Sequence, residues 1–231
     1  MFRAFASAIF FSCLAFTPAA FAQTDEHTFP KDRVPRSGAS EKDFAPAGWV
    51  VEESIKGDLN GDGRTDLAIK LIEAESPNAD PDINEDRQRA LVVALADPNG
   101  GYTRAAVSDG LLQCTGCGGA FYGVMPAPAN VSIKRGVLIV AQDHGSRNLQ
   151  QSTYKIRFDP ASGHFILIGF DTTDRDRLTG DVIKLSTNYL TGVRITTRMP
   201  EKGRTTTKRT PVSRDKQYLD DLDHGLLETI E

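Results

Sequence analysis

The chain has 231 residues and a formal net charge of −4, with 27 Lys or Arg and 31 Asp or Glu. Its basic residues are spread out, apart from the threonine-containing group Lys202–Arg209, so we expect no nucleic-acid partner. The length is that of one domain with its own hydrophobic core.

Residues 1–22 have the features of a secretory signal peptide. Met1–Arg3 is a short positive start, Ala4–Phe16 is apolar, and Ala20 and Ala22 supply the small residues of a signal-peptidase site. We expect cleavage after Ala22, which leaves a mature chain of 209 residues (231 minus 22). The apolar stretch is too short for a stable anchor, and no second one follows it in the sequence. The predicted location is periplasmic or secreted, with no transmembrane segment in the mature chain.

Residues 23–42 are polar, contain two prolines and have few apolar side chains. Such a segment cannot bury enough apolar surface to order itself, which predicts a flexible leader. The predicted domain is therefore 43–231, with its ordered part beginning near Phe44 or Trp49.

From Val50 onward, apolar residues tend to recur at every second position, which is the period of a β-strand. The expected strands are Val50–Lys56, Asp66–Ile72, Arg89–Ala96, Tyr102–Val107, Val131–Gly136, Val137–Ala141, Ser152–Phe158, His164–Phe170, Val182–Thr187 and Gly192–Arg198. Asn99 and Gly100 lie between two of these strands and are typical of a hairpin turn, because both tolerate positive φ.

The pattern predicts an all-β fold of antiparallel sheets in a single domain. A sandwich and a few propeller-like blades are both compatible with it. Only the short acidic segment Leu219–Ile230 has a helical character.

One loop carries a complete set of oxygen donors for a hard cation. The donors are Asp58, Asn60, Asp62, the main-chain carbonyl of Arg64, and Asp66. Alternate residues of a tightly curled loop point inward, and Gly63 permits the sharp reversal of the chain. Ca²⁺ takes six to eight such oxygens, whereas Mg²⁺ keeps its waters and demands a strict octahedron, so Ca²⁺ is the expected ion.

The loop differs from an EF-hand, which places a bidentate Glu at its twelfth position, where this chain has Ile69. It resembles instead the Ca²⁺ loop of FG-GAP and VCBS repeats, with the pattern Asp-x-Asn-x-Asp-Gly-x-x-Asp-Leu. The resemblance implies the same five ligands and a loop that joins two strands. Residues 43–198 also resemble a group of exported bacterial proteins of unknown function. The motif occurs once, and the predicted mature chain of 209 residues is too short for the seven blades of an integrin-type propeller. A propeller of that size is therefore excluded.

Exported modules with such sites commonly bind Ca²⁺ with a Kd on the order of 10⁻⁴–10⁻³ M. At a free Ca²⁺ concentration of about ten times the Kd, the ion would stabilise the fold by about 1.4 kcal/mol. We therefore expect a structural ion and no switch.

Cys114 and Cys117 are the two cysteines of the predicted mature chain. An oxidising compartment favours a short-loop disulfide that fixes the glycine-rich turn containing Gly118 and Gly119. A redox-active pair is the alternative, although no helix signal follows the cysteines, as a thioredoxin-like motif would require.

Three weaker patterns suggest further chemistry. Asp143, His144 and Ser146 suggest a hydrolase, but neighbouring residues rarely form a triad. The acidic stretch 78–86 could hold a second cation, although a solvated loop is the simpler interpretation. Tyr122 and Tyr189 could line a carbohydrate groove, although aromatic residues near strand ends more often belong to the core or its rim.

The sequence as a whole predicts an exported, calcium-stabilised and non-enzymatic β-domain. Its expected role is that of a binding or envelope-associated module for an unknown protein or glycan ligand. The alternative is a secreted or periplasmic hydrolase that acts on a glycan or an ester.

Overall fold

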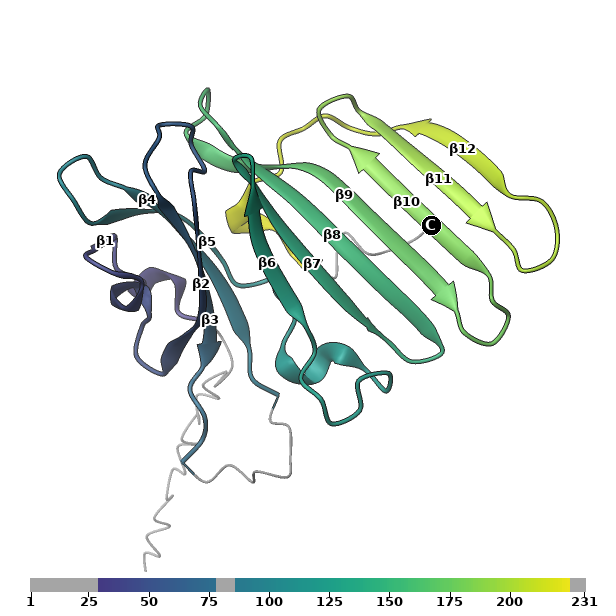
Figure 1. Cartoon of the computed structure of the whole chain (residues 1–231), viewed down its shortest axis with the longest axis horizontal. Coiled ribbons are helices and arrows are strands. Elements are labelled where there is room, and N and C mark those ends of the chain that lie inside the picture. Colours follow the sequence, from purple (N-terminus) through teal and green to yellow (C-terminus); the bar gives the residue numbers. More distant parts are fainter. Residues whose placement is uncertain (1–28, 78–85, 225–231) are drawn as a thin grey trace, which may run out of the picture.

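The computed structural model describes residues 29–77 and 86–224, and it is built from two antiparallel sheets (Figure 1). The five-stranded sheet has the order β1-β5-β4-β3-β2, and the seven-stranded sheet has the order β12-β11-β10-β9-β8-β7-β6. The strands are β1 Ser37–Gly38, β2 Trp49–Gly57, β3 Asp66–Glu73, β4 Arg89–Ala96, β5 Tyr102–Ser108, β6 Ala129–Lys134, β7 Val137–Gly145, β8 Asn148–Asp159, β9 His164–Asp176, β10 Val182–Asn188, β11 Val193–Met199 and β12 Thr206–Pro211. Four 3₁₀ turns accompany them, namely η1 Lys31–Arg33, η2 Glu41–Phe44, η3 Thr115–Gly118 and η4 Leu219–Asp221. The predicted all-β, antiparallel, single-domain fold is confirmed.

Tight turns with positive φ set the register of the hairpins. Between β4 and β5, Gly100 and Gly101 have φ of 95° and 80°. Between β6 and β7, Arg135 and Gly136 have φ of 53° and 73°, the conformation that matches the twist of a two-residue hairpin. In these two hairpins the second strand therefore folds back on the first without a long connection.

The main core lies between the two sheets. The five-stranded sheet contributes Leu91 and Val93. The seven-stranded sheet contributes Tyr154, Ile156 and Phe165. All five residues are completely buried. Tyr154 and Ile156 are two residues apart in β8, so they share one of its faces. This packing of sheet against sheet favours the sandwich of the two architectures considered.

The second face of the five-stranded sheet is covered by the N-terminal segment. Phe29 and Val34 are 5 % and 2 % exposed there, and Phe44 is completely buried. The ring of Phe29 meets that of Trp49 edge-on, with 4.6 Å between centroids. Apolar residues on both faces explain why β3 reads as a continuous apolar run instead of an alternating one.

The prediction of a flexible leader over residues 23–42 is wrong for residues 29–42. That prediction rested on the low apolar content of the segment, but its few apolar side chains find a sheet face to cover. The Lys31 ammonium also donates to the Asp220 carbonyl at 2.9 Å and pairs with Asp109 at 2.7 Å. Residues 23–28 lie outside the described residues.

The predicted strands are all present, and the longest of them, β8 and β9, extend beyond their predicted ends. β12 was not predicted as a strand, because Lys202–Arg209 was interpreted as a basic cluster. In the C-terminal segment, Leu219–Asp221 forms a 3₁₀ turn, and residues 225–231 are not described. No helix in the described part of the chain has the length and apolar character needed to cross a membrane.

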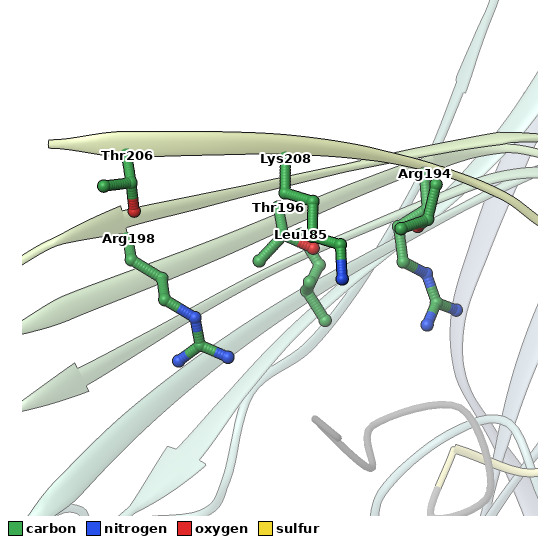
Figure 2. A pocket seen from close by; sticks show the side chains of 7 residues that line it. Leu185, Arg194, Thr196, Arg198, Thr206 and Lys208 are labelled. Atoms are coloured by element: carbon green, nitrogen blue, oxygen red, sulfur yellow. The ribbon is translucent and has the colours of Figure 1, made fainter.

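The seven-stranded sheet extends past its partner sheet, so that β10–β12 project beyond the sandwich in Figure 1. We call the side of this sheet that carries Tyr154 its inner face and the opposite side its outer face. Over β10–β12 the inner face carries Arg194, Arg198 and Lys208, whose side chains point off the same side of the sheet (Figure 2).

The turn between β8 and β9 gives a titration prediction. Asp159 accepts from the Lys216 ammonium at 2.6 Å and from the Ser162 hydroxyl at 2.7 Å, and these bonds lower its pKa to about 2. Because the folded-state pKa lies below the ordinary value, the stabilisation is complete above about pH 4 and is lost as the pH falls through about 2. NMR titration of the Asp159 carboxyl should give the low pKa, and Lys216→Met should raise it toward the ordinary value. An unchanged pKa in Lys216→Met would show that the ammonium is not the main cause.

Candidate metal site

The predicted cation loop connects β2 to β3 and is anchored in the main core. Gly57 pairs with Asp66 at the base of the hairpin. Leu59, the second residue of the loop, is 2 % exposed and belongs to the core between the sheets. The main-chain oxygen of Asp58 lies close to Gly136, in the β6–β7 turn of the other sheet. The conformation of the loop is therefore tied to the junction between the two sheets.

Backbone N–H groups converge on the first carboxylate of the loop. The Asp58 carboxylate accepts from Gly61 N at 2.7 Å and from Gly63 N at 2.9 Å. Both glycines have positive φ, 82° and 80°, which a residue with a side chain rarely adopts. These bonds produce the tight curl that the sequence motif predicted.

The middle of the loop is held by two further turns of the same kind. The Asn60 side-chain oxygen accepts from Asp62 N at 3.1 Å, and the Asp62 carboxylate accepts from Arg64 N at 2.8 Å. Asp62 also pairs with the Arg64 guanidinium and accepts from the Asn60 amide at 2.8 Å. The pKa of Asp62 is lowered, first by the Arg64 N–H, then by the Asn60 amide, and also by the Arg64 charge.

Asp66 has a role that the motif alone does not reveal. Its side chain is completely buried at the start of β3. One carboxylate oxygen accepts from Leu59 N at 2.8 Å, and the other accepts from Ala96 N at 2.9 Å. Asp66 thus joins the loop to the end of β4, and each oxygen keeps a lone pair for a second partner.

The donor atoms suit Ca²⁺ in their chemical type and in their spacing along the sequence. In the structure, however, the three carboxylates are spread apart. Among the described residues, the carboxylate oxygens of Asp58, Asp62 and Asp66 are not all within 4.8 Å of one another. A cation bound by all three would require these carboxylates to come closer together. The residues therefore fit a cation site in chemical type, and one of its donors, Asp62, is also paired with Arg64.

The cysteines form the predicted disulfide. Cys114 and Cys117 are joined with an S–S distance of 1.97 Å across η3. The Asp86 carboxylate lies against Cys114, and the three residues form the single group of potential metal ligands found in the described part of the chain. A disulfide sulfur is a poor metal ligand because the ligand form of cysteine is the thiolate. The alternative of a redox-active cysteine pair is not tested by the structure.

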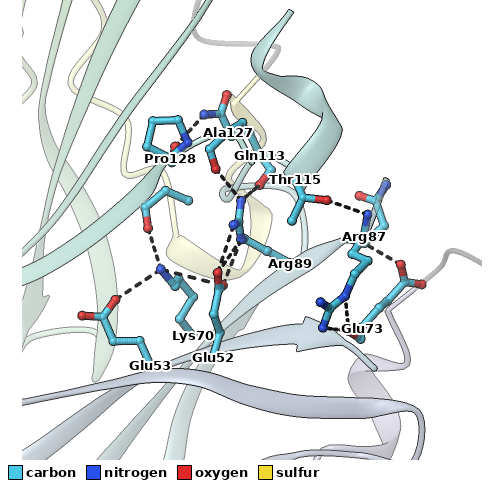
Figure 3. Close-up of polar contacts among 12 residues, drawn as sticks. Glu52, Glu53, Lys70, Glu73, Arg87, Arg89, Gln113, Thr115, Ala127 and Pro128 are labelled. Atoms are coloured by element: carbon cyan, nitrogen blue, oxygen red, sulfur yellow. Dashed lines mark hydrogen bonds and ion pairs between the residues drawn. The ribbon is translucent and has the colours of Figure 1, made fainter. Parts of the chain in front are cut away.

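A buried charge network, missed in the sequence, fastens the connection between the sheets (Figure 3). The Arg89 guanidinium bonds both Glu52 carboxylate oxygens at 2.9 Å and donates to the carbonyls of Gln113 and Ala127 at 3.1 and 2.9 Å. Lys70 donates to the Ala129 carbonyl at 3.0 Å. These carbonyls belong to the segment that leaves β5 and enters β6. The available signals were Lys70 inside the apolar run of β3 and Arg89 directly before that of β4.

The weaker sequence patterns are not assembled into sites. Asp143 and His144 are neighbours in β7, so their side chains leave opposite faces of the sheet and do not form a catalytic pair. Asp143 instead accepts from the Tyr122 hydroxyl at 2.6 Å, and burial together with this carboxylate raises the pKa of Tyr122 to about 12. Tyr189 is 8 % exposed in the core, which leaves it no surface for stacking on a sugar. The acidic stretch 78–86 lies outside the described residues except for Asp86.

Comparisons of the chain with protein-family models, with curated proteins and with solved structures gave no match. The resemblance of the loop to FG-GAP and VCBS repeats therefore stays a prediction.

Proposed function

We propose that this chain is an exported, calcium-stabilised and non-enzymatic binding module, in which the ion holds the loop Asp58–Asp66. The observation that carries the proposal is the position of Leu59. It lies between the first two donors and is buried in the core between the sheets. An ion that fixes the loop therefore also fixes a core residue, which is how a structural ion contributes to stability.

The bound ion would supply positive charge to three carboxylates held within nine residues. The chain supplies the rest. Asp58 and Asp66 are already oriented by backbone N–H groups, so few side-chain rotamers remain to be ordered on binding. Asp62 is paired with Arg64, whose positive charge competes with that of the ion. This competition fits an affinity in the weak range of exported modules, on the order of 10⁻⁴–10⁻³ M.

A hydrolase acting on a glycan or an ester has no comparable support. Its best sequence candidates, Asp143 and His144, point to opposite faces of β7. A turnover that Asp62→Ala abolishes without unfolding the protein would nevertheless establish this alternative.

Thermal unfolding tests the calcium proposal. At a free concentration of about ten times the Kd, Ca²⁺ should stabilise the native chain by about 1.4 kcal/mol. A domain of this size then melts about 3–6 °C higher. EDTA should reverse the shift, and Asp62→Ala should abolish the response to both reagents. Asp215→Ala is the matched control, because it removes an exposed carboxylate in a different loop. Melting that responds neither to Ca²⁺ nor to EDTA in the unmodified chain would refute the site.

A further inference from the structure

The inner face of β10–β12 forms a groove of about 430 Å³ outside the sandwich. Three cationic side chains line it, together with threonine hydroxyls and one apolar side chain. The lining residues are Leu185, Arg194, Thr196, Arg198, Thr206, Lys208 and Thr210. The groove belongs to other strands than the cation loop and shares no residue with it, so the two can be tested separately.

The strand register places the three cations at regular intervals. Arg194 pairs with Thr210, Lys208 with Thr196, and Arg198 with Thr206. Residues that pair directly share a face, and successive residues on one face are about 7 Å apart along the strand. Arg194, Lys208 and Arg198 therefore follow one another at steps of about 7 Å in the strand direction, with the middle cation on the neighbouring strand.

These charges are not neutralised within the described part of the chain. None of the three forms an ion pair there, although several other cations do, such as Lys155 with Asp171 on the outer face. The guanidinium of Arg194 donates to the Thr187 hydroxyl at 3.0 Å, which orients it without cancelling its charge. Figure 2 shows Arg198 and Lys208 extending from the sheet on the same side as Arg194.

We propose that this groove binds an extended acidic peptide segment of a partner protein. An extended peptide presents alternate side chains on one side at the same repeat of about 7 Å. Acidic residues at every second position can thus meet Arg194, Lys208 and Arg198 in turn. Thr196 and Thr206 offer hydroxyls to the intervening backbone, and Leu185 supplies an apolar floor.

The composition of the groove favours a peptide over a sugar chain, because no aromatic side chain is among its lining residues. Recognition here depends on charge, and charge complementarity mainly sets specificity and association rate. The inference rests on the proposed binding-module function and names its site and ligand chemistry.

Fluorescence anisotropy with a labelled peptide tests the proposal. The probe is a ten-residue peptide of alternating Glu and Ser, compared with one of Gln and Ser and with one that has its five Glu residues in a block. We expect the alternating acidic peptide to bind best and its affinity to fall with added salt. Lys208→Glu should weaken binding about tenfold or more, because it replaces an attraction with a repulsion.

The same strand provides the control variant. Arg209 is exposed and lies on the outer face of β12, paired with Ile195, so Arg209→Glu makes the same charge change away from the groove. Its affinity for the alternating peptide should equal that of the unmodified chain. Equal losses in Lys208→Glu and Arg209→Glu would show binding by net charge alone and would overturn the proposal, as would an alternating peptide that binds no better than the block peptide.

The same variants distinguish a peptide ligand from other possible ligands of the groove. Binding of an anionic polysaccharide or of anionic lipid vesicles that Lys208→Glu abolishes, without peptide binding, would contradict a peptide ligand. A dimer that Lys208→Glu dissociates in sedimentation experiments would assign the groove to a second copy. Each arm is run with Ca²⁺ and with EDTA. If melting responds to Ca²⁺ but no acidic peptide binds, the groove assignment alone is refuted. If the acidic peptide binds but melting does not respond to Ca²⁺, the calcium site alone is refuted.

Discussion

Replacing Arg89 with methionine is expected to lower the free energy of unfolding by about 3 kcal/mol. The Arg89 side chain is 4 % exposed, and its removal leaves the Glu52 carboxylate without its main partner. The carbonyls of Gln113 and Ala127 lose a charged donor at the same time. Glu52 is 25 % exposed, so water can reach it in part, which places the effect at the lower end of the range for broken buried pairs. Urea unfolding followed by circular dichroism measures the loss.

Two further variants show whether charge burial is the cause. Arg147→Met breaks an ion pair with Asp176 in which the arginine side chain is 59 % exposed, and its effect should be far smaller. Adding Glu52→Gln to Arg89→Met should recover part of the stability, because it removes the stranded charge. A double variant that is less stable than Arg89→Met would contradict this explanation and assign the loss to packing.

Replacing Asp66 with alanine should destabilise the chain by about 2–6 kcal/mol, even when EDTA is present. The N–H groups of Leu59, which is buried, and of Ala96, which is half-buried, lose their acceptor, and each unsatisfied buried donor costs about 1–3 kcal/mol. The loss should not depend on a cation, because the partners that Asp66 satisfies are backbone N–H groups. Urea unfolding in EDTA is again the measurement.

The matched variant is Asp62→Ala, which removes a carboxylate of the same loop whose backbone donor, Arg64 N, lies at the surface. In EDTA it should unfold close to the unmodified chain, whereas in Ca²⁺ it should lack the stabilisation that the ion gives. If Asp66→Ala were as stable as Asp62→Ala in EDTA, the buried carboxylate would have no structural role of its own.

Local patterns in the sequence predicted most of the strands and their turns. The period of two predicted the strand Ser152–Phe158, which lies within β8, and Asn99 with Gly100 marked the β4–β5 hairpin. The placement of the cation loop between two strands also followed from the sequence, because apolar runs border it on both sides. These features depend on neighbouring residues, whose periodicity can be read directly.

Features that depend on distant partners could not be read in this way. Phe29 and Val34 are isolated apolar residues in a polar segment, and they order because the five-stranded sheet offers them a face. β12 has no apolar alternation, because it is an edge strand outside the sandwich and neither of its faces is buried. The second role of Asp66 requires Ala96, which is 30 residues away.

Calorimetric titration of Ca²⁺ into the metal-free chain tests most directly whether one ion binds at Asp58–Asp66 and stabilises the fold. We predict one site per chain with a Kd on the order of 10⁻⁴–10⁻³ M, absent in Asp62→Ala and retained in Asp215→Ala. No detectable binding by the unmodified chain, or binding that Asp62→Ala leaves unchanged, would contradict a calcium site in this loop.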